Sequence, residues 1–570
     1  MHKLANNTGN LEMVDSKYRS GGRLIVDCLK AQGVDRVFCV PGESYLPVLD
    51  ALYDSGIQVV VAKHEGGAAM MAEADGKLTG RPGVCFVTRA PGSTNASSGI
   101  HVAQHDSTPL VLFIGQVARS MRGRGAFQEI DHCQFYRDMA KWVEEIQEVD
   151  RIPEIMSRAW HAALNGRPGP VVLSIPEDIM LQDSSSIPGE MVTATASAPT
   201  AYQVELFIRL LSESKKPILI LGGSQWTKPS YSMIHEFAER WHIPVACSFR
   251  RQSLFDNLHP NYAGDVGLGI NPKLKQRIQI SDLLILLGTR FSQNASQGYS
   301  LVSIPHPNVK LVHVHPDINE FGRVYHPTLA INSTPEEFLK NSLSLFPTNI
   351  SRDVSEDHIN YQEWSENPPS SSGKAKLSEI MLSLRSMLNN NSIITNGAGN
   401  YAIWVHRFHQ YRTLHSQLAP TSGSMGYGLP AAIAAKLRFP EKDVICFAGD
   451  GCFQVTEQEF GTAVQYGANI IVILIDNGMY GTIRMHQELR YPGRVSATNL
   501  HNPDFAELAK TYGGYGETVI SSDDFAAAFQ ACRKSRKPSL IHVKVDPNAI
   551  TPNASLADIR SMGEQSGKTA

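Results

Sequence analysis

The fold of this chain is decided by the stretch from Gly449 to Gly481, GDGCFQVTEQEFGTAVQYGANIIVILIDNGMYG. It begins at the end of one apolar run, DVICFAG, and contains the end of a second, NIIVILI. Both runs are too short for buried helices and rich in Val or Ile, so we predict two buried strands. Between them, Thr456 and Glu459 have the spacing of a helix-capping box, and Gly467 stands where a C-cap belongs. The stretch therefore predicts a βαβ unit with a right-handed crossover.

Two polar residues follow these strands, at the edge where ligands bind in open α/β sheets. Asp450 follows the first strand and Asn477 the second, and neighbouring parallel strands lie about 5 Å apart. A carboxylate, an amide oxygen and free loop carbonyls suit Mg²⁺, which often bridges to a diphosphate. Gly449 and Gly451 let the backbone come close to a diphosphate, and the following amides can donate to it. We predict a metal-bound diphosphate here; the alternative is an ordinary strand-to-helix turn with a polar tip.

Length and composition limit the class of protein. With 570 residues the chain is too long for one hydrophobic core, and about three to four domains are expected. A net charge of −3 and the lack of a basic cluster argue against a nucleic-acid partner. No apolar run approaches a membrane span, and the N-terminus lacks the apolar core of a signal peptide. The 8 cysteines are scattered without a CxxC pair, which favours reduced thiols in a cytoplasmic protein.

Strands alternate with helices along the chain, which predicts an α/β protein with three doubly wound parallel-sheet domains. Segments rich in Ser, Thr, Ala and Pro separate these domains and are expected to be linkers. The expected division is a disordered lead-in over 1–20, an N-terminal domain over 21–186, a middle domain over 201–346, a C-terminal domain over 375–550 and a mobile tail over 551–570.

Glu65 lies between a predicted strand, IQVVVAKHE, and a predicted helix of small residues that Gly80 closes. This position puts Glu65 at the ligand edge of the first sheet. A glutamate in the first turn of a helix is common, because the helix dipole favours it. A functional carboxylate is the less frequent alternative on this local pattern alone.

The segment from Lys63 to Ile100, KHEGGAAMMAEADGKLTGRPGVCFVTRAPGSTNASSGI, closely resembles the pyrimidine-binding domain of the acetohydroxyacid synthase group of thiamine-diphosphate-dependent enzymes. The stretch from Gly449 to Gly481 resembles the diphosphate and Mg²⁺ motif of the same superfamily, which also includes benzaldehyde lyase and 2-oxo acid decarboxylases. The resemblance covers about Arg23 to Asp546. It implies that the first and last domains have the thiamine-diphosphate-binding fold.

The resemblance implies a role for residues in both domains. Asp450, Asn477 and the backbone carbonyl of Met479 would hold Mg²⁺, and Glu65 would hydrogen-bond the aminopyrimidine ring. Positions that bind the cofactor in the family are matched by Gly399, Asn400, Gly423, Met425, Gly449, Gly451 and Cys452. Positions that line the reaction pocket are matched by Gln116, Phe127 and Gln128.

Met425 and two histidine pairs have ordinary structural alternatives. Met425 would lie beneath the bent cofactor in the family, whereas a methionine is usually a core residue. His101 and His105 are four residues apart but lack a third ligand, so a structural helix is favoured over a metal site. His313 and His315 share one face of a predicted strand, where a packed pair is favoured over a metal site.

The middle domain departs from the flavin-dependent members of the family. The segment GTRFSQNASQGY keeps Arg290 and Phe291 but lacks the acidic and basic residues that usually follow, which argues against FAD. Arg250 and Arg251 replace small polar residues near a loop that can reach the pocket. They are candidates to bind a substrate carboxylate in bidentate fashion, with solvated surface arginines as the more conservative interpretation.

The activity that the resemblance implies is a thiamine-diphosphate- and Mg²⁺-dependent carboligase or lyase acting on 2-oxo acids, like acetolactate synthase. A 2-oxo acid such as pyruvate would be decarboxylated and joined to a second carbonyl compound, an aldehyde or ketone. The alternatives are a non-ligating decarboxylase of the benzoylformate decarboxylase type, a pyruvate oxidase type and, in another class, a catalytically silent cofactor-binding subunit. The presence of Glu65 argues against the silent subunit.

The resemblance also implies a homodimer or homotetramer, because the cofactor of this family lies between the first domain of one subunit and the last domain of another. Glu65 and Asp450 of one site would then belong to different chains.

Overall fold

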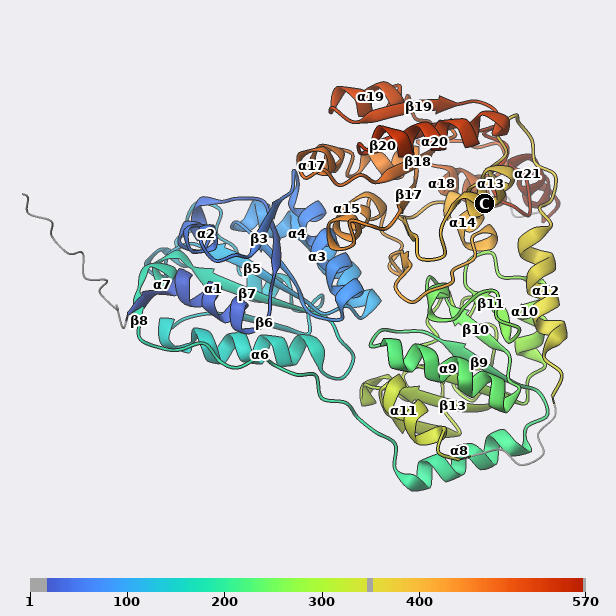
Figure 1. Cartoon of the computed structure of the whole chain (residues 1–570), viewed down its shortest axis with the longest axis horizontal. Helices are drawn as coiled ribbons and strands as arrows, with labels where there is room; N and C mark the ends of the chain where they lie inside the picture. Colours follow the sequence, from blue (N-terminus) through green and yellow to red (C-terminus); the bar gives the residue numbers. More distant parts are fainter. Residues whose placement is uncertain (1–17, 346–351, 567–570) are drawn as a thin grey trace, which may run out of the picture.

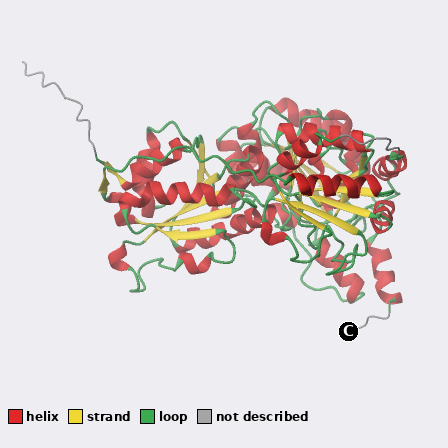
Figure 2. Cartoon of the chain, turned by 90° about the horizontal axis from the view of Figure 1, so that it is seen from below, coloured by secondary structure: helices red, strands yellow, loops and turns green. Residues whose placement is uncertain are grey.

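The computed structural model describes residues 18–345 and 352–566, which form an N-terminal, a middle and a C-terminal domain (Figure 1). Within these residues each domain contains a six-stranded sheet whose neighbouring strands are all parallel. Figure 2 shows the strands as layers between helices. The predicted class, three doubly wound parallel-sheet domains, is confirmed.

The sheet of the N-terminal domain has the order β3-β2-β4-β5-β7-β6. Its strands are β2 Arg36–Cys39, β3 Gln58–Val61, β4 Gly83–Val87, β5 Leu110–Gln116, β6 Trp142–Glu145 and β7 Pro170–Pro176. Its helices are α1 Gly21–Ala31, α2 Leu46–Tyr53, α3 Glu65–Thr79, α4 Ala90–Asp106, α5 His132–Phe135, α6 Ile152–Leu164 and α7 Glu177–Leu181. Strands β4, β5 and β7 are buried along their whole length, as expected for a parallel sheet covered on both faces.

The sheet of the C-terminal domain repeats this topology, with the order β16-β15-β17-β18-β20-β19. Its strands are β15 Ile393–Asn396, β16 Gln417–Leu418, β17 Val444–Gly449, β18 Ile471–Asp476, β19 Tyr515–Val519 and β20 Ser539–Lys544. Its helices are α13 Leu377–Met387, α14 Tyr401–Phe408, α15 Gly428–Arg438, α16 Asp450–Gln454, α17 Glu459–Gln465, α18 Gly481–Arg490, α19 Phe505–Thr511 and α20 Phe525–Ser535. The two outer domains therefore share one strand order.

The middle domain has a different order, β11-β10-β9-β12-β13-β14, which is that of a dinucleotide-binding sheet. Its strands are β9 Pro217–Leu221, β10 Val245–Ser248, β11 Tyr262–Val266, β12 Leu283–Leu287, β13 Lys310–His315 and β14 Leu329–Asn332. Its helices are α8 Ala201–Glu213, α9 Lys228–Trp241, α10 Pro272–Gln279 and α11 Pro335–Ser342.

The segments at the ends and between domains carry more structure than expected. The lead-in lies outside the described residues up to 17, and Arg19–Ser20 forms β1, antiparallel to β8 Asp183–Ser184. The mobile tail expected over 551–570 contains helix α21 Leu556–Gln565, which Arg560 ties to buried Glu488 with two hydrogen bonds of 2.6 and 2.7 Å.

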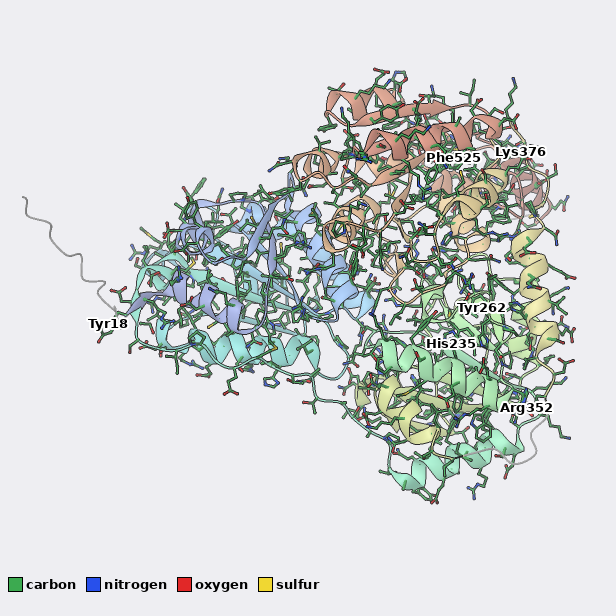
Figure 3. All side chains as sticks on the ribbon, in the orientation of Figure 1. Tyr18, His235, Tyr262, Arg352, Lys376 and Phe525 are labelled. Carbon is green, nitrogen blue, oxygen red and sulfur yellow. The ribbon has the colours of Figure 1, made fainter. Side chains whose placement is uncertain are left out.

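The second predicted linker is also partly helical, as α12 Ser355–Glu366. Before this helix, Arg352 donates to the carbonyls of Ser214 and Trp241 and so fastens the chain to the middle domain (Figure 3). Helix α12 then spans two domains, because His358 bonds the carbonyl of Tyr262 while Arg407 of α14 donates to the carbonyl of Trp364.

The βαβ unit of the C-terminal domain has the predicted strands but not the predicted helix cap. Strands β17 and β18 are parallel neighbours, with Gly449 opposite Ile475. The hydroxyl of Thr456 donates instead to the carbonyl of Gly426 at 2.7 Å, and α17 begins only at Glu459. The predicted capping box is wrong, because both side chains are used in contacts between elements.

Glu459 links the C-terminal domain to the N-terminal domain. Its fully buried carboxylate accepts from the amides of Lys63 at 3.2 Å and His64 at 2.9 Å, immediately before α3. Nearby, α15 packs against α3 (Figure 1). There the hydroxyl of Tyr427 donates to buried Glu73 at 2.5 Å. Because buried polar groups must keep their partners, these bonds define how the outer domains of one chain meet.

Replacing Glu459 with Ala is expected to lower the free energy of unfolding by about 1–3 kcal/mol, because the amides of Lys63 and His64 lose the buried carboxylate that accepts from them. Urea denaturation followed by tryptophan fluorescence measures the change. Exposed Glu441→Ala is the control, with an expected change within about 0.5 kcal/mol. Equal changes in both variants would contradict the bridging role of Glu459.

Candidate functional site

A cavity of about 350 Å³ lies at the carboxyl ends of strands β15, β17 and β18. We call it the clamp cavity. Every C-terminal residue predicted for the cofactor or metal lines it: Gly399, Asn400, Gly423, Met425, Gly449, Asp450, Gly451, Cys452, Asn477 and Met479. Parallel strands bring these residues together because their carboxyl ends share one edge of the sheet.

Asp450 is a buried carboxylate, 3% exposed, at the first position of α16. Within the described residues no Lys, Arg or His side chain forms an ion pair with it. Its Oδ2 accepts from Nδ2 of Asn502 at 2.8 Å. Burial raises the pKa of Asp450 to about 6. A carboxylate held in this way, without a neutralising cation, fits a divalent metal ion.

Asn502 connects Asp450 to Asp476, and Asp476 is hydrogen-bonded to His542. Nδ2 of Asn502 also donates to Asp476 Oδ1 at 2.7 Å, and His542 Nε2 lies 2.8 Å from Asp476 Oδ2. Burial alone would raise the pKa of Asp476, but the hydrogen bonds from His542 and Asn502 outweigh it and lower the pKa to about 2. Sequence reasoning missed Asn502 and His542, because they lie beyond the stretch from Gly449 to Gly481 and no motif marks them.

The loop after β18 orients the other two predicted metal ligands. Asn477 Oδ1 accepts from the amide of Met479 at 3.3 Å, and Gly478 has a φ of +67°, which favours glycine. Met479 pairs with Asn499 in an isolated antiparallel bridge. A carboxylate, an amide and a backbone carbonyl therefore meet at one edge, and this donor set fits Mg²⁺.

Two tyrosine rings pack closely against glycines of the clamp cavity. A Cβ on Gly449 would lie 3.0 Å from the ring of Tyr401, and one on Gly451 would lie 2.6 Å from the ring of Tyr480. The hydroxyl of Tyr401 donates to Cys452 Sγ at 3.3 Å and accepts from the amide of Gly397 at 3.0 Å. The backbone is thus exposed to a ligand between aromatic walls, an arrangement that suits a diphosphate.

The four residues predicted in the N-terminal domain do not line the clamp cavity of their own chain. Glu65 opens α3, is half-buried, and accepts from Asn95 Nδ2 at 2.9 Å. Gln116 is fully buried at the end of β5 and donates to the carbonyl of Ile130 at 2.9 Å. The structure therefore leaves the two predicted halves of the site apart within one chain.

Phe127 and Gln128 lie on the loop after β5. The side chain of Phe127 is 73% exposed. Gln128 has a φ of +63°, and its carbonyl accepts from the amide of Ala90 at the start of α4. Both residues stand near the carboxyl edge of the first sheet, the edge that also carries Glu65.

Both histidine pairs stand in regular elements, His101 and His105 on α4 and His313 and His315 on β13. The rings of His101 and His105 are 4.4 Å apart on α4. His313 and His315 are buried, and His313 Nε2 bonds the carbonyl of Thr289. Across the described ranges, no three His, Cys, Asp or Glu side chains form a group that could hold a metal ion.

The preference for solvated arginines at positions 250 and 251 is wrong. Arg250 is 4% exposed and lines the clamp cavity. The guanidinium of Arg251 donates to the carbonyls of Gly223, Arg250 and Asp106, at 2.9 to 3.0 Å. The loop after β10 turns both side chains inward, which the sequence spacing did not indicate.

Three family models match the chain, one in each domain. Residues 19–135 match the thiamine pyrophosphate enzyme N-terminal TPP binding domain, 204–341 the central domain and 397–543 the C-terminal TPP binding domain.

Curated relatives cover nearly the whole chain. The acetolactate synthase isozyme 2 large subunit of Escherichia coli K12 is 31% identical over 92% of this chain and 96% of its own length. The acetolactate synthase large subunit of Corynebacterium glutamicum is 31% identical, over 95% and 90%. A probable acetolactate synthase large subunit of Methanococcus aeolicus is 30% identical, over 95% and 95%.

Metal-free Asp450→Asn is expected to be more stable than the metal-free parent at pH 7, by about 1–3 kcal/mol. Asp450 has a folded pKa of about 6, against about 4 when unfolded. The protonated side chain gives its full stabilisation below the unfolded-state pKa, and this stabilisation is lost as the pH rises through the folded-state pKa. The advantage of the variant should therefore grow between about pH 4 and pH 6 in urea denaturation.

Asp476→Asn is the matched control, with the opposite sign. The folded pKa of Asp476 is about 2, so its carboxylate stabilises the fold above the unfolded value, and this variant should be less stable than the parent at pH 7. If Asp450→Asn instead makes the metal-free protein less stable, the Asp450 carboxylate is not uncompensated.

Proposed function

Since this chain belongs to the thiamine-diphosphate-dependent enzymes of the acetolactate synthase group, we propose that it decarboxylates a 2-oxo acid such as pyruvate and joins the remainder to a second carbonyl compound. The observation that carries the proposal is the convergence of ten predicted residues on one cavity. An enzyme with this proposed activity would be classed as a transferase or a carbon–carbon lyase.

The residues of the clamp cavity would hold the cofactor by its diphosphate. Asp450, Asn477 and the carbonyl of Met479 would bind Mg²⁺, and the glycine backbone would donate to the phosphate oxygens. Bound thiamine diphosphate supplies a nucleophilic carbon and an electron sink for the loss of carbon dioxide. Met425, half-buried in the cavity wall, would support the middle of the cofactor.

Apolar walls favour ligation over simple protonation. Trp404 is buried and Ile403 is half-buried in the wall of the same cavity, and a wall that excludes water slows proton delivery to the reacting carbon. This supports acetolactate-type ligation over the non-ligating decarboxylase.

We propose a homodimer as the minimal active unit, with a homotetramer as its possible extension. Glu65 of one chain would then reach the clamp cavity of a second copy and hold the pyrimidine in its reactive protonation state. Exposed apolar side chains at the same sheet edge support this, namely Phe127 at 73%, Leu46 at 57% and Met121 at 51% exposed. A second copy would bury them.

The proposed location is the cytoplasm. All 8 cysteines are free in the structure, which suits a reducing compartment. Among the described residues, no helix is long and apolar enough to cross a membrane.

Glu65→Ala is expected to lower carbon dioxide release from pyruvate by at least about 100-fold, the usual contribution of a general acid–base group. Mass spectrometry of the products separates the alternatives: a 2-hydroxy-2-methyl-3-oxo acid indicates ligation, an aldehyde indicates simple decarboxylation, and acetyl phosphate or acetate with bound flavin indicates the oxidase type. Exposed Glu154→Ala is the control. Cofactor binding without release from any 2-oxo acid would instead favour the silent subunit.

Co-expression of Glu65→Ala and Asp450→Ala chains tests the shared site. Each variant alone is expected to be inactive. In a mixed dimer, one of the two sites combines Glu65 and Asp450 from chains that keep them, so random pairing should restore about a quarter of the parent activity. No restoration, with mixed dimers isolated through two affinity tags, would place both residues of a site in one chain.

A further inference from the structure

Arg250 is a buried cation that forms no ion pair with any residue that the structure describes. It stands on the loop after β10 with a φ of +60° and is 4% exposed. Its Nη1 donates to the carbonyl of Pro420 at 2.5 Å, while Nε is buried without a partner. Throughout the described ranges, Nη2 has no acceptor and no carboxylate pairs with the guanidinium. Burial of an unpaired guanidinium is strongly unfavourable unless an anion compensates it.

Arg251 shows what a structural arginine looks like in this loop. Its guanidinium donates hydrogen bonds to the carbonyls of Gly223, Arg250 and Asp106. Its Nη2 also lies 3.9 Å from Asp106 Oδ1. Arg250 has one such bond, and within the described residues Nε and Nη2 at the other edge of its guanidinium have no hydrogen-bond partner. That edge is the one that binds a carboxylate with two parallel hydrogen bonds.

The clamp cavity has one positive and one negative side chain. Of the residues that line it, Arg250 alone is a lysine or arginine, and Asp450 alone is a carboxylate. His406 adds no positive charge, because burial and the charge of Arg250 lower its pKa well below the usual value. The walls include Phe249, whose ring centre is 4.9 Å from the Arg250 guanidinium. Asp450 suits a metal ion, and Arg250 is the positively charged side chain of the same cavity, where an anion would compensate it.

We propose that Arg250 binds the carboxylate of the 2-oxo acid and thereby selects carboxylate-bearing substrates over neutral aldehydes. The inference rests on the proposed function and names the group that recognises its substrate class. Apolar neighbours such as Leu268 and Ile403 would accept a short hydrocarbon substituent beside that carboxylate. Arg250 would act by binding and orienting the substrate, without taking part in proton transfer.

The test compares the parent, Arg250→Gln and Arg250→Lys as cofactor-loaded enzymes. Titration calorimetry with oxamate, an unreactive carboxylate related to a 2-oxo acid, should show binding weakened about 10- to 100-fold in Arg250→Gln. The oxamate affinity of Arg250→Lys should lie between those of the parent and Arg250→Gln, because an ammonium keeps the charge but not the two parallel donors of a guanidinium. KM for pyruvate should rise by a similar factor, while ligation between two neutral aldehydes changes less than about threefold.

Two controls separate recognition from structure. Arg251→Lys should lower the thermal midpoint without changing the preference for pyruvate over aldehydes. Affinity for thiamine diphosphate, measured by tryptophan fluorescence quenching, should stay within about twofold of the parent in both Arg250 variants. Unchanged oxamate binding, an equal loss with neutral aldehydes, or weakened cofactor binding would each overturn the proposal.

The result also separates this inference from the proposed function. Oxamate binding that depends on Arg250, in an enzyme that releases no carbon dioxide from 2-oxo acids, would support carboxylate recognition while refuting the decarboxylation. Decarboxylation of pyruvate with full activity in Arg250→Gln would do the reverse.

Discussion

The uncompensated carboxylate of Asp450 is the constraint around which the C-terminal domain is arranged. A buried carboxylate without a cation is unfavourable in the empty protein, and the fold tolerates it by supplying Asn502 as donor at 2.8 Å. Asp476 also accepts from Asn502, and His542 is hydrogen-bonded to Asp476 in turn. Strands β17 and β18 position this network because their carboxyl ends adjoin in register. The charged form of Asp450 is therefore unfavourable in this domain, and a bound cation would remove that cost.

The contact between the outer domains fixes where Glu65 lies relative to the clamp cavity of its own chain. Glu459 fastens the residues just before α3 to the C-terminal domain of the same chain, and Tyr427 bonds Glu73 within α3. Glu65, the next residue after His64, is thereby held outside the clamp cavity of its own chain. A packed and hydrogen-bonded interface does not slide to bring them together, so the geometry supports a site shared between two copies.

Prediction from sequence succeeded where local pattern and sheet geometry agree. The apolar runs before Asp450 and Asn477 became adjacent parallel strands, and all ten clamp residues line one cavity. Prediction failed where a side chain bonds an element that is distant in the sequence. Thr456 and Glu459 had the spacing of a capping box, but they bond Gly426 and the segment before α3. The helices α12 and α21 escaped prediction because their stability comes from contacts such as Arg407 to Trp364 and Arg560 to Glu488.

The sequence by itself determined the α/β class, the family and the two strand ends that carry the clamp. These follow from hydrophobic periodicity and from residue types at short spacing, which depend only on neighbours along the chain. Only the tertiary structure decided that Asp450 is buried without an ion-pair partner among the described residues, that Glu65 lies outside its cavity, and that Arg250 is buried in the cavity wall with one hydrogen bond. Burial and pairing depend on atoms that the fold brings from distant segments, and no local pattern records where those atoms will be.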